Sequence, residues 1–504
     1  MHLLPPSLEE MIPEKHLVRV VNKVIDELDL SKLKKQYKGG GTSSYHPRMM
    51  LKVLVYAYTQ RTYSSRQIAK ALRENVNYMW LSGMNKPDFR TINRFRGEVV
   101  KEVVEEVFSE VLEYLIKQGY VGLEDCFVDG TKIEANANRY SFVWRKSTEN
   151  YKKKLQEKVR QIMEEVERVN EAEEERYGEK DLEELGEEAE IDSEGMKELV
   201  ERLNEKLKEE PKDKQLKRTV KKLEREFIPR MEKYERHEQV FRGRNSFSKT
   251  DEDATFMCMK EDHMRNRQLK PGYNVQIGTE KQFIVSFSLH QKPSDGTCLI
   301  PHMEQMQNQT GRIPKNMIAD AGYGSEENYA YLEEKGINAY VKYNTFDREQ
   351  KKRRKIPERE TYWSSNWEYD EQQDEFICPQ GKRLTYQKTT IKHSANGYRS
   401  ERRIYSCDQC ETCPVRTRCT TSAHGRSVMM SLNIRDFRQQ ARDRLQSSEG
   451  KRYRSQRLIE AEAVFGRLKH NWGFRRFLLR GLEKVKTEWG VLCTAHNIAK
   501  LAVV

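Results

Sequence analysis

The stretch Met317–Tyr343 reads MIADAGYGSEENYAYLEEKGINAYVKY. It opens as an apolar strand that ends at Asp320, and two glycines come just after that acid. Residues 325–335 predict a helix, and residues 337–343 predict a second strand. This strand–helix–strand alternation predicts a sheet flanked by helices, which is an α/β fold.

Further strands are predicted upstream of this stretch. Residues 273–277 and 283–289 are apolar runs separated by Gly-Thr-Glu-Lys, so they predict a hairpin, and a helix is expected at 297–308. Residues 123–135 predict another strand. In that strand Asp129 lies within a short apolar run and precedes a turn-permissive glycine.

The N-terminal region predicts short helices. Residues 15–38 predict one amphipathic helix that ends at the glycines 39–41. Shorter helices with tight turns follow, and the last of them, within 87–96, is basic. This pattern is typical of a helix-turn-helix module, with Arg90, Arg94 and Arg96 clustered on its recognition helix. An ordinary small helical bundle is the alternative.

The composition changes abruptly beyond Lys146. Apolar residues within 155–169 and again within 216–227 are spaced alternately four and three apart, which predicts a coiled-coil-like helical hairpin. An acidic, glycine-containing segment around 171–190 is expected at its tip as a loop. The heptads suit pairing within the chain or between chains, and the charge run by itself is typical of a solvated face.

Residues 351–440 are basic, polar and cysteine-bearing. The cysteines of this region are Cys378, Cys407, Cys410, Cys413 and Cys419. A tetrahedral zinc site needs four thiolates on short loops, and this spacing fits a zinc-ribbon plan. Because there are more candidates than places, a degenerate knuckle that packs without metal is the alternative.

The overall charge narrows the class of partner. The chain of 504 residues has a formal net charge of +12 at pH 7 and a pI of about 9.0. We expect a polyanionic partner, nucleic acid rather than a membrane, because no amphipathic anchor, leader or bilayer-spanning run is apparent. The cysteines are sparse and odd in number, at 9, which indicates a reducing cytosol and not a disulfide framework.

The segment Tyr453–Gly481 places one acid among many basic residues. The residues that recur at helical spacing and predict a buried face are Leu458, Ala461, Phe465, Leu468 and Trp472. Glu462 falls on the rim of that face, and Lys469, seven residues on, lies on almost the same side of the helix. A half-buried acid there suits a metal ion beside a phosphate backbone, whereas a salt-bridged surface helix is the alternative.

Asp129, Asp320 and Glu462 are candidates for one site. In an open α/β sheet, acids at neighbouring strand ends and on a packed helix can converge although they are far apart in sequence. Three carboxylates in one place repel one another, and divalent cations remove that penalty. A strand-end Asp alone is commonly a turn former, so the prediction depends on the three acids together. Such a site cleaves phosphodiesters or transfers strands.

Four stretches of the chain, taken together, resemble a bacterial insertion-sequence transposase of the DDE class. They are Tyr45–Arg96, Val128–Asn138, Ile318–Tyr329 and Tyr453–Gly481. The first resembles the helical DNA-binding domain of that family, and the next two resemble the motifs of its first and second acids. In the fourth, Glu462 and Lys469 have the family's E-(six)-K spacing.

Two details of the fourth stretch bear on this resemblance. Tyr453 and Arg457 lie four apart and not at the family's spacing, so no role is assigned to Tyr453. Glu460 is the acid that competes with Glu462, and it fits the spacing to Lys469 less well.

The resemblance implies an α/β RNase H-like catalytic core of the retroviral-integrase type, with an all-α N-terminal domain. The core is interrupted by the coiled-coil-like helical insert and the Cys-rich insert. The implied boundaries are 1–115 for the DNA-binding domain, 120–146 with 245–350 and 440–504 for the core, 147–240 for the helical insert and 351–439 for the Cys-rich insert.

The resemblance also implies the chemistry. Asp129, Asp320 and Glu462 are expected to bind two Mg²⁺ ions, which Mn²⁺ can replace, for nicking at the transposon ends and attack by the freed 3′-OH. The residues expected to contact DNA are Arg66, Arg90, Arg94, Arg96, Tyr323, Arg457, Lys469, Arg475, Arg476 and Arg480. Trp472 is expected in the core rather than stacked on an unpaired base.

Double-stranded DNA, as terminal inverted repeats and as target, is the expected partner, with a homodimer on paired ends in the bacterial cytoplasm at the nucleoid. Two other functions remain open. A DNA-binding regulator on an inactive transposase frame is one, and the three intact acids argue against it. A nuclease without strand transfer is the other, because it would use the same site.

Overall fold

The computed structural model describes residues 6–36, 45–177, 191–209, 211, 213–259, 268–350 and 358–503. The chain divides into two compact units. The larger unit comprises Met1–Ile133, Asn274–Leu479 and Glu483–Val504, and the smaller comprises Glu134–Tyr273 and Arg480–Leu482. Within the described ranges, no helix is long and apolar enough to cross a membrane.

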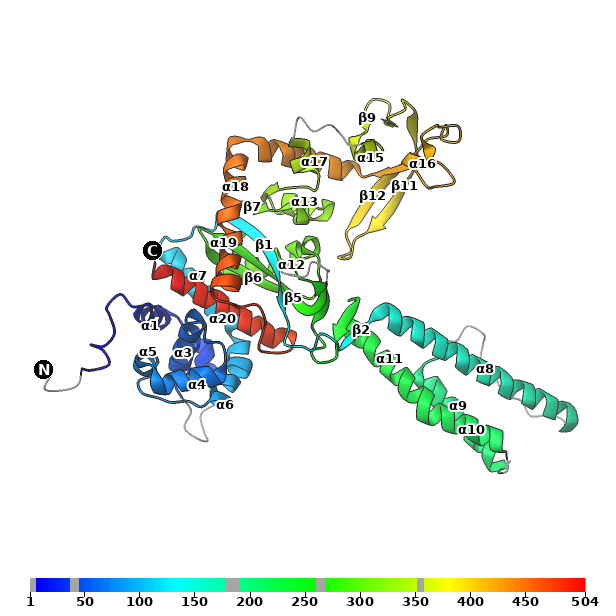
Figure 1. Cartoon of the computed structure of the whole chain (residues 1–504), viewed down its shortest axis with the longest axis horizontal. Helices are drawn as coiled ribbons and strands as arrows, with labels where there is room; N and C mark the ends of the chain where they lie inside the picture. The colour runs from blue at the N-terminus through cyan, green and yellow to red at the C-terminus, as the bar shows by residue number, and fades with distance from the viewer. Residues whose placement is uncertain are drawn as a thin grey trace. The chain divides into compact units, whose positions relative to one another are not determined.

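A mixed sheet forms the centre of the larger unit (Figure 1). In spatial order its strands are β4 (Thr255–Cys258), β5 (Leu269–Glu280), β1 (Asp125–Glu134), β7 (Asn316–Ala319) and β8 (Asn338–Val341), and β6 (Phe283–His290) also pairs with β5. β5 and β6 form the predicted antiparallel hairpin, and β1, β7 and β8 are parallel. The predicted sheet of strands alternating with helices is therefore confirmed.

Helices cover the free edge of β6. They are α12 (Leu299–Thr310) and α20 (Leu482–Leu501); α7 (Val104–Lys117) packs on α12, and α13 (Glu326–Glu334) contacts β8. The Asn497 amide of α20 accepts from the Ile284 N–H and donates to its carbonyl, both at 2.8 Å. The Gln309 amide of α12 does the same for Phe287, at 3.3 and 3.2 Å. These amides satisfy backbone groups that an exposed edge strand would leave unpaired.

The N-terminal region is helical, as predicted. Its helices are α1 (Leu17–Glu27), α2 (Ser31–Lys35), α3 (Pro47–Thr59), α4 (Ser65–Glu74), α5 (Val76–Leu81) and α6 (Phe89–Arg94). The prediction of one continuous helix over 15–38 was wrong, because Leu28 is extended at φ −74° and ψ 144°. In one continuous helix, Leu28 and Leu30 would lie on opposite sides. The break allows both side chains to be buried. The glycines 39–41 lie outside the described residues.

Arg96 is a core residue and not part of a DNA-binding face. Its side chain is only 2% exposed, and its guanidinium donates to the Tyr58 hydroxyl at 3.1 Å and to the Tyr63 carbonyl at 2.8 Å. Glu488 of α20 is also buried and accepts from the backbone N–H groups of 478 and 479. Burial raises the pKa of Glu488, and the charge of Arg96 opposes that rise. The two charges therefore stabilise each other in the core.

The C-terminal segment is not one continuous helix. Its elements are α17 (Leu432–Gln446), α18 (Ser448–Ile459), α19 (Ala461–Gly466) and the π-helical turn Arg467–Asn471. The helix breaks at Glu460, which has φ −81° and ψ −92°. Ala461, Phe465, Leu468 and Trp472 are buried as predicted, whereas Leu458, before the break, is 58% exposed. The prediction for Leu458 was wrong because it assumed one unbroken helical face.

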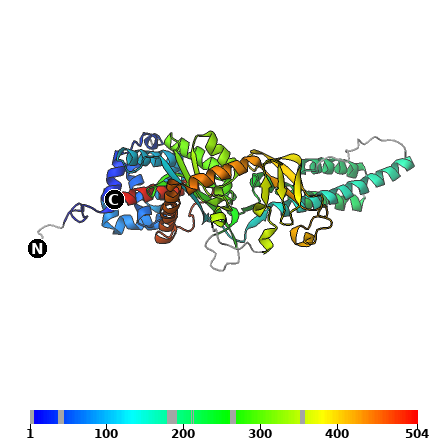
Figure 2. The ribbon, with the colours of Figure 1, turned by 90° about the horizontal axis from the view of Figure 1, so that it is seen from above.

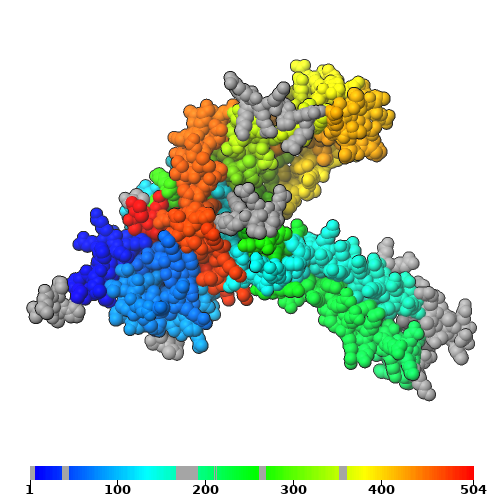
Figure 3. Space-filling model, viewed as in Figure 1, coloured from blue at the N-terminus to red at the C-terminus, as the bar shows by residue number. Residues whose placement is uncertain are grey.

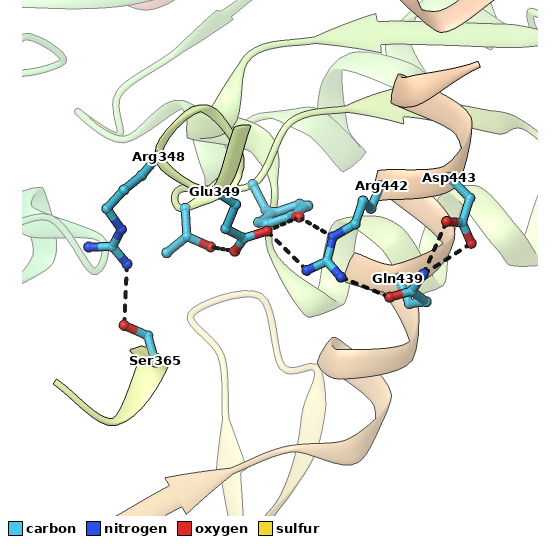
Figure 4. Close-up of polar contacts among 8 residues, drawn as sticks. Arg348, Glu349, Ser365, Gln439, Arg442 and Asp443 are labelled. Carbon is cyan, nitrogen blue, oxygen red and sulfur yellow. Dashed lines mark hydrogen bonds and ion pairs between the residues drawn. The ribbon is translucent and has the colours of Figure 1, made fainter. Parts of the chain in front are cut away.

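A polar network holds α17 against the segment that follows β8 (Figure 4). Arg442 donates to the Tyr343 hydroxyl at 3.1 Å and forms an ion pair with Glu349 at 2.9 Å. The Tyr343 hydroxyl donates to the same Glu349 carboxylate at 2.6 Å. Gln439 accepts from Arg442 at 2.9 Å and donates to Asp443 at 3.0 Å, so it orients the guanidinium from its own helix.

The Cys-rich region folds as a second, antiparallel sheet of the larger unit. Its strands are β9 (Glu368–Asp370), β10 (Glu375–Ile377), β11 (Arg383–His393), β12 (Arg399–Ser406) and β13 (Ser427–Met430), and their spatial order is β13-β12-β11-β10-β9. Trp367, Phe376, Leu384 and Tyr405 pack with cysteine side chains in its small core. Residues 351–357 lie outside the described residues.

The smaller unit contains the charged helical region. Its helices are α8 (Arg145–Tyr177), α9 (Ser193–Glu209), α10 (Lys214–Lys222) and α11 (Ile228–Phe241). Figures 1 and 2 show α8 and α11 lying side by side, and Leu155 and Val159 of α8 share one core with apolar residues of the other three helices. The region is helical, as predicted. It is more than a two-helix hairpin, because α9 also contributes side chains to this core. Most of the predicted acidic tip, 178–190, lies outside the described residues.

We expect Arg96→Met to lower the free energy of unfolding by about 3–5 kcal/mol at neutral pH, because it leaves the buried Glu488 without its opposing charge. The variant should raise the folded-state pKa of Glu488 further above its unfolded value. A raised carboxyl pKa contributes stability that is present at low pH and lost as the pH rises through the folded-state value. The deficit of the variant should therefore shrink as the pH falls, which urea unfolding at several pH values measures.

Arg94→Met is the matched control, because Arg94 lies two residues away with a 79% exposed side chain. It should change stability by less than about 0.5 kcal/mol. Equal and small losses in the two variants would contradict a core role for Arg96.

Candidate active site

The strand register brings two of the predicted acids to adjacent positions. β1 and β7 are parallel neighbours, and Phe127 lies opposite Ile318. Continuing that register by two residues sets Asp129 opposite Asp320, which is the first residue beyond β7. Adjacent strands lie about 4.8 Å apart, so the two carboxylates share one edge of the sheet.

Each of these acids has one oxygen fixed by the backbone. Asp129 is 7% exposed, and its Oδ1 accepts from the Gly130 N–H at 2.8 Å. Asp320 precedes a single 3₁₀ turn, Ala321–Tyr323, and its Oδ1 accepts from the Gly322 N–H at 2.8 Å. Because short local bonds of this kind restrain the side chain, both carboxyl groups have a defined direction, that of Asp129 within β1 and that of Asp320 just beyond β7.

Tyr323 is buried behind the acids. Its hydroxyl donates to the side-chain carbonyl of Gln276 on β5. Burial raises the pKa of Tyr323 well above its usual range, and the charges of Asp295, Asp129 and Asp320 raise it further. Tyr323 has almost no exposed surface, so its side chain is not in a position to touch DNA, contrary to the prediction.

Lys469 holds the C-terminal helix beside the first acid. Its side chain is 6% exposed, and its Nζ donates to the Thr131 hydroxyl at 3.1 Å and to the Lys132 carbonyl at 3.4 Å. It belongs to the π-helical turn that follows α19. Wide turns of this kind inside helices are frequent at functional sites. The lysine therefore anchors this helix two residues beyond Asp129 on β1.

Glu462 lies in the first turn of α19 and is exposed. Its Oε1 forms an ion pair with Arg457 at 2.9 Å. It precedes Lys469 by seven residues, about 10 Å along a helix. In the space-filling view the segment that contains α18 and α19, drawn in orange, is exposed (Figure 3). For the described residues, the partner shown for Glu462 is Arg457 and not Asp129 or Asp320.

Glu460, the competing acid, binds the protein backbone. Its carboxylate accepts from the Gln282 N–H at 2.6 Å, in the turn between β5 and β6. Burial raises the pKa of Glu460. Glu280, at the end of β5, binds the backbone N–H groups of 122 and 123, just before β1. Glu460 therefore lies near the beginning of β1, whereas Asp129 lies in the middle of that strand.

The predicted arginines of the N-terminal helices divide into two groups. Arg66 and Arg90 are exposed and lie over the Phe89 ring, at 5.2 and 5.7 Å from its centre. Arg94 is exposed and only loosely paired with Glu98, at 3.8 Å. These three can face a polyanion, whereas the buried Arg96 cannot.

The basic residues after the π-helical turn are exposed. Arg475 donates to the Lys469 carbonyl at 3.3 Å, and Arg476 follows it on the surface. Arg480, in the smaller unit, donates to the Asn136 carbonyl at 2.7 Å. Trp472 is buried, and its carbonyl accepts from the Tyr63 hydroxyl at 2.9 Å. The predicted core place of Trp472 is confirmed.

All the cysteines of the second sheet line one small cavity. Its volume is about 20 Å³, and its lining includes Cys378, Cys407, Cys410, Cys413 and Cys419. The Arg426 N–H donates to the Cys410 sulfur at 3.3 Å. Burial raises the pKa of the Cys407 thiol to about 11. Within the part of the chain that the structure describes, no group of three or more His, Cys, Asp or Glu side chains is already arranged to hold a metal ion.

Buried Asn274 and Gln276 form a polar group with the half-buried Asp295 beside the acids, and the sequence interpretation missed these three residues. Asp295 Oδ1 accepts from the Asn274 amide at 2.8 Å and from the Gln276 amide at 3.1 Å. The alternation of two amides in an otherwise apolar strand was a usable signal, because positions two apart share one face. Asp295 gave no such signal, since a Pro-Ser-Asp-Gly sequence is typical of an ordinary turn.

Two stretches of the chain match models of transposase families. Residues 377–502 match the Transposase DDE domain, and residues 6–98 match the Transposase domain (DUF772). The DDE match contains Glu462 and Lys469, while Asp129 and Asp320 lie outside both stretches. No curated protein matches the chain. The two family matches, in the expected order along the chain, show that it belongs to the insertion-sequence transposases of the DDE class.

Proposed function

We propose that this DNA transposase cleaves transposon ends and joins them to target DNA at a site formed by Asp129, Asp320 and Glu462. The observation that supports the proposal is the β1–β7 register, which pairs Phe127 with Ile318 and, continued by two residues, would bring Asp129 opposite Asp320. Two carboxylates this close repel each other, and divalent cations, with Mg²⁺ first and Mn²⁺ as a substitute, remove that cost. The donor set therefore fits such cations. When bound, two of them stabilise the attacking and leaving oxygens of a phosphodiester.

The sheet supports an RNase H-like catalytic core. An antiparallel hairpin, β5 with β6, lies on one side of β1, and the parallel strands β7 and β8 lie on the other. This arrangement leaves the end of β7 beside the middle of β1, at the centre of the sheet. Ligands of open α/β sheets bind at this kind of edge, outside the carboxyl ends of parallel strands.

Glu462 would complete the site if its carboxylate turned from Arg457 toward a bound cation. In this ion pair the Glu462 side chain is 45% exposed and the Arg457 side chain is 15% exposed, so the carboxylate remains accessible to a cation from solvent. The break at Glu460 and the anchor at Lys469 fix both ends of the short helix that carries Glu462. Arg457, once released, would be available to a phosphate near the cleaved bond.

DNA would be held by two sets of exposed basic residues. Arg66, Arg90 and Arg94 of the N-terminal helices would bind the terminal inverted repeat, and Arg475, Arg476 and Arg480 would bind phosphates near the cut. Phosphate contacts supply most of the affinity and make it fall with salt. We expect a homodimer on paired ends, in the bacterial cytoplasm at the nucleoid. A nuclease without strand transfer would use the same residues, and strand-transfer products distinguish the two.

We further propose that the cysteine cavity holds one structural Zn²⁺. Cys378, Cys407, Cys410 and Cys419 pack into the small core of the second sheet, whereas Cys413 lines the cavity without joining that core. Four thiolates suit tetrahedral zinc. The backbone N–H that donates to Cys410 is the type of bond that orients a thiolate ligand. Packing without metal is the competing interpretation.

We expect Asp129→Asn to reduce nicking of end DNA by roughly 10³-fold, because several kcal/mol of charge stabilisation are lost. Binding of end DNA should stay nearly unchanged, since the substitution removes no basic contact. Asp125→Asn is the matched control, because Asp125 lies four residues earlier on β1 and also accepts from an amide and a hydroxyl. Nicking and gel-shift assays measure both effects. Loss of binding with residual cleavage intact would sink the assigned role.

The zinc proposal predicts about one zinc per chain in the purified protein, and close to none in Cys378→Ser. Cys413→Ser is the internal control and should retain the metal. Elemental analysis by mass spectrometry of the two variants and the parent decides the question. A parent chain without zinc, or a Cys413→Ser variant that loses it, would show that the proposed ligand set is wrong.

A further inference from the structure

Asp295 is tied directly to the strand beside the first acid. It begins a 3₁₀ turn, Asp295–Thr297, between β6 and α12. Its Oδ1 accepts from the amides of Asn274 and Gln276, and both amides are fully buried on one face of β5. Gln276 also donates to the Asn274 carbonyl at 2.9 Å, so the two amides are fixed relative to each other.

The same group reaches the backbone next to Asp129. A side chain built at Gly130 would place its Cβ 2.1 Å from the Gln276 amide nitrogen and 2.8 Å from Asp295 Oδ1. The Gln276 amide and the Asp295 carboxylate therefore occupy the space that a side chain at position 130 would need. Any larger residue at this position would have to displace the Gln276 amide or the Asp295 carboxylate, because a real Cβ essentially never lies within 3.0 Å of another atom.

On its other side, the Asp295 turn packs against the turn that carries Asp320. A Cβ built at Gly296 would lie 2.8 Å from the Gly322 carbonyl. The Asn328 amide donates to the carbonyls of both Gly296 and Tyr323, at 2.9 and 2.8 Å, and so joins the two turns. Gln276 accepts from the Tyr323 hydroxyl. Asp295 is thus in contact with the surroundings of both acids.

The charge of Asp295 needs an explanation beyond these hydrogen bonds. An asparagine carbonyl could accept from the same two amides. The carboxylate instead adds a negative charge beside two others, which is unfavourable unless a cation is present. Within the described residues, neither Asp295 nor Asp320 forms an ion pair with a lysine or arginine.

We propose that Asp295 is a positioning residue of the metal site, which fixes Asp129 and Asp320 through Gln276 and Tyr323 and strengthens cation binding by its charge. This inference rests on the proposed function. Partners that orient metal ligands from outside typically cost 10–100-fold in affinity or activity when they are replaced.

The test is a Mn²⁺ titration, followed by electron paramagnetic resonance, of the full chain and of Asp295→Asn. We expect the variant to bind Mn²⁺ at least about tenfold more weakly and to need more Mg²⁺ for half-maximal nicking. Its melting temperature in metal-free buffer should match the parent, because asparagine keeps the acceptor. Asp125→Asn, at the other end of β1, should match the parent in all three measurements.

Unchanged Mn²⁺ affinity in Asp295→Asn would overturn the inference. So would a weaker affinity that only accompanies a lower metal-free melting temperature, because Asp295 would then act by packing alone. A parent chain that binds no Mn²⁺ would instead contradict the proposed function, so the two failures are distinguishable.

Discussion

The parallel pairing of β1 with β7 is the constraint on which the rest of the site depends. It sets Asp129 and Asp320 side by side, although 190 residues of sequence lie between them and include the whole helical region of the smaller unit. Their repulsion is a cost that hydrophobic burial of the strands must offset, unless a cation does so. The neighbouring polar groups are consistent with this: each acid is restrained by a glycine N–H, and Tyr323, Gln276 and Asp295 fill the space beneath them.

The N-terminal helices are tied to the C-terminal segment by buried polar contacts. Arg96 and Glu488 stabilise each other in the core, and the Tyr63 hydroxyl binds the carbonyl of Trp472. Trp472 directly follows the π-helical turn in which Lys469 contacts β1. The helices proposed to bind the transposon end are therefore packed against the same short segment that carries Glu462 and its anchor.

The sequence predicted what depends on residue type and periodicity. Apolar runs in the sequence predicted β1, β5, β6 and β7. Asp129 and Asp320 were recognised as candidates because each is an acid within or directly after such a run. Burial was harder to predict. Arg94 and Arg96 are identical in type and only two residues apart, and only the packing of Arg96 against Tyr58 and Glu488 distinguishes them. The predicted burial of Leu458 was wrong because the backbone break at Glu460 turns the preceding helix, so Leu458 no longer shares a face with the buried residues after the break. The strands of the Cys-rich region were missed, since β11 is exposed on nearly all its residues and shows no alternation.

A crystal structure of the chain soaked with Mn²⁺ and bound to end DNA would test the central claim most directly. The account predicts anomalous density between the carboxylates of Asp129 and Asp320, at about 2.2 Å from their oxygens, with Glu462 turned from Arg457 toward the metal. Manganese bound elsewhere, with Glu462 still paired to Arg457 and the two aspartates without metal, would contradict it.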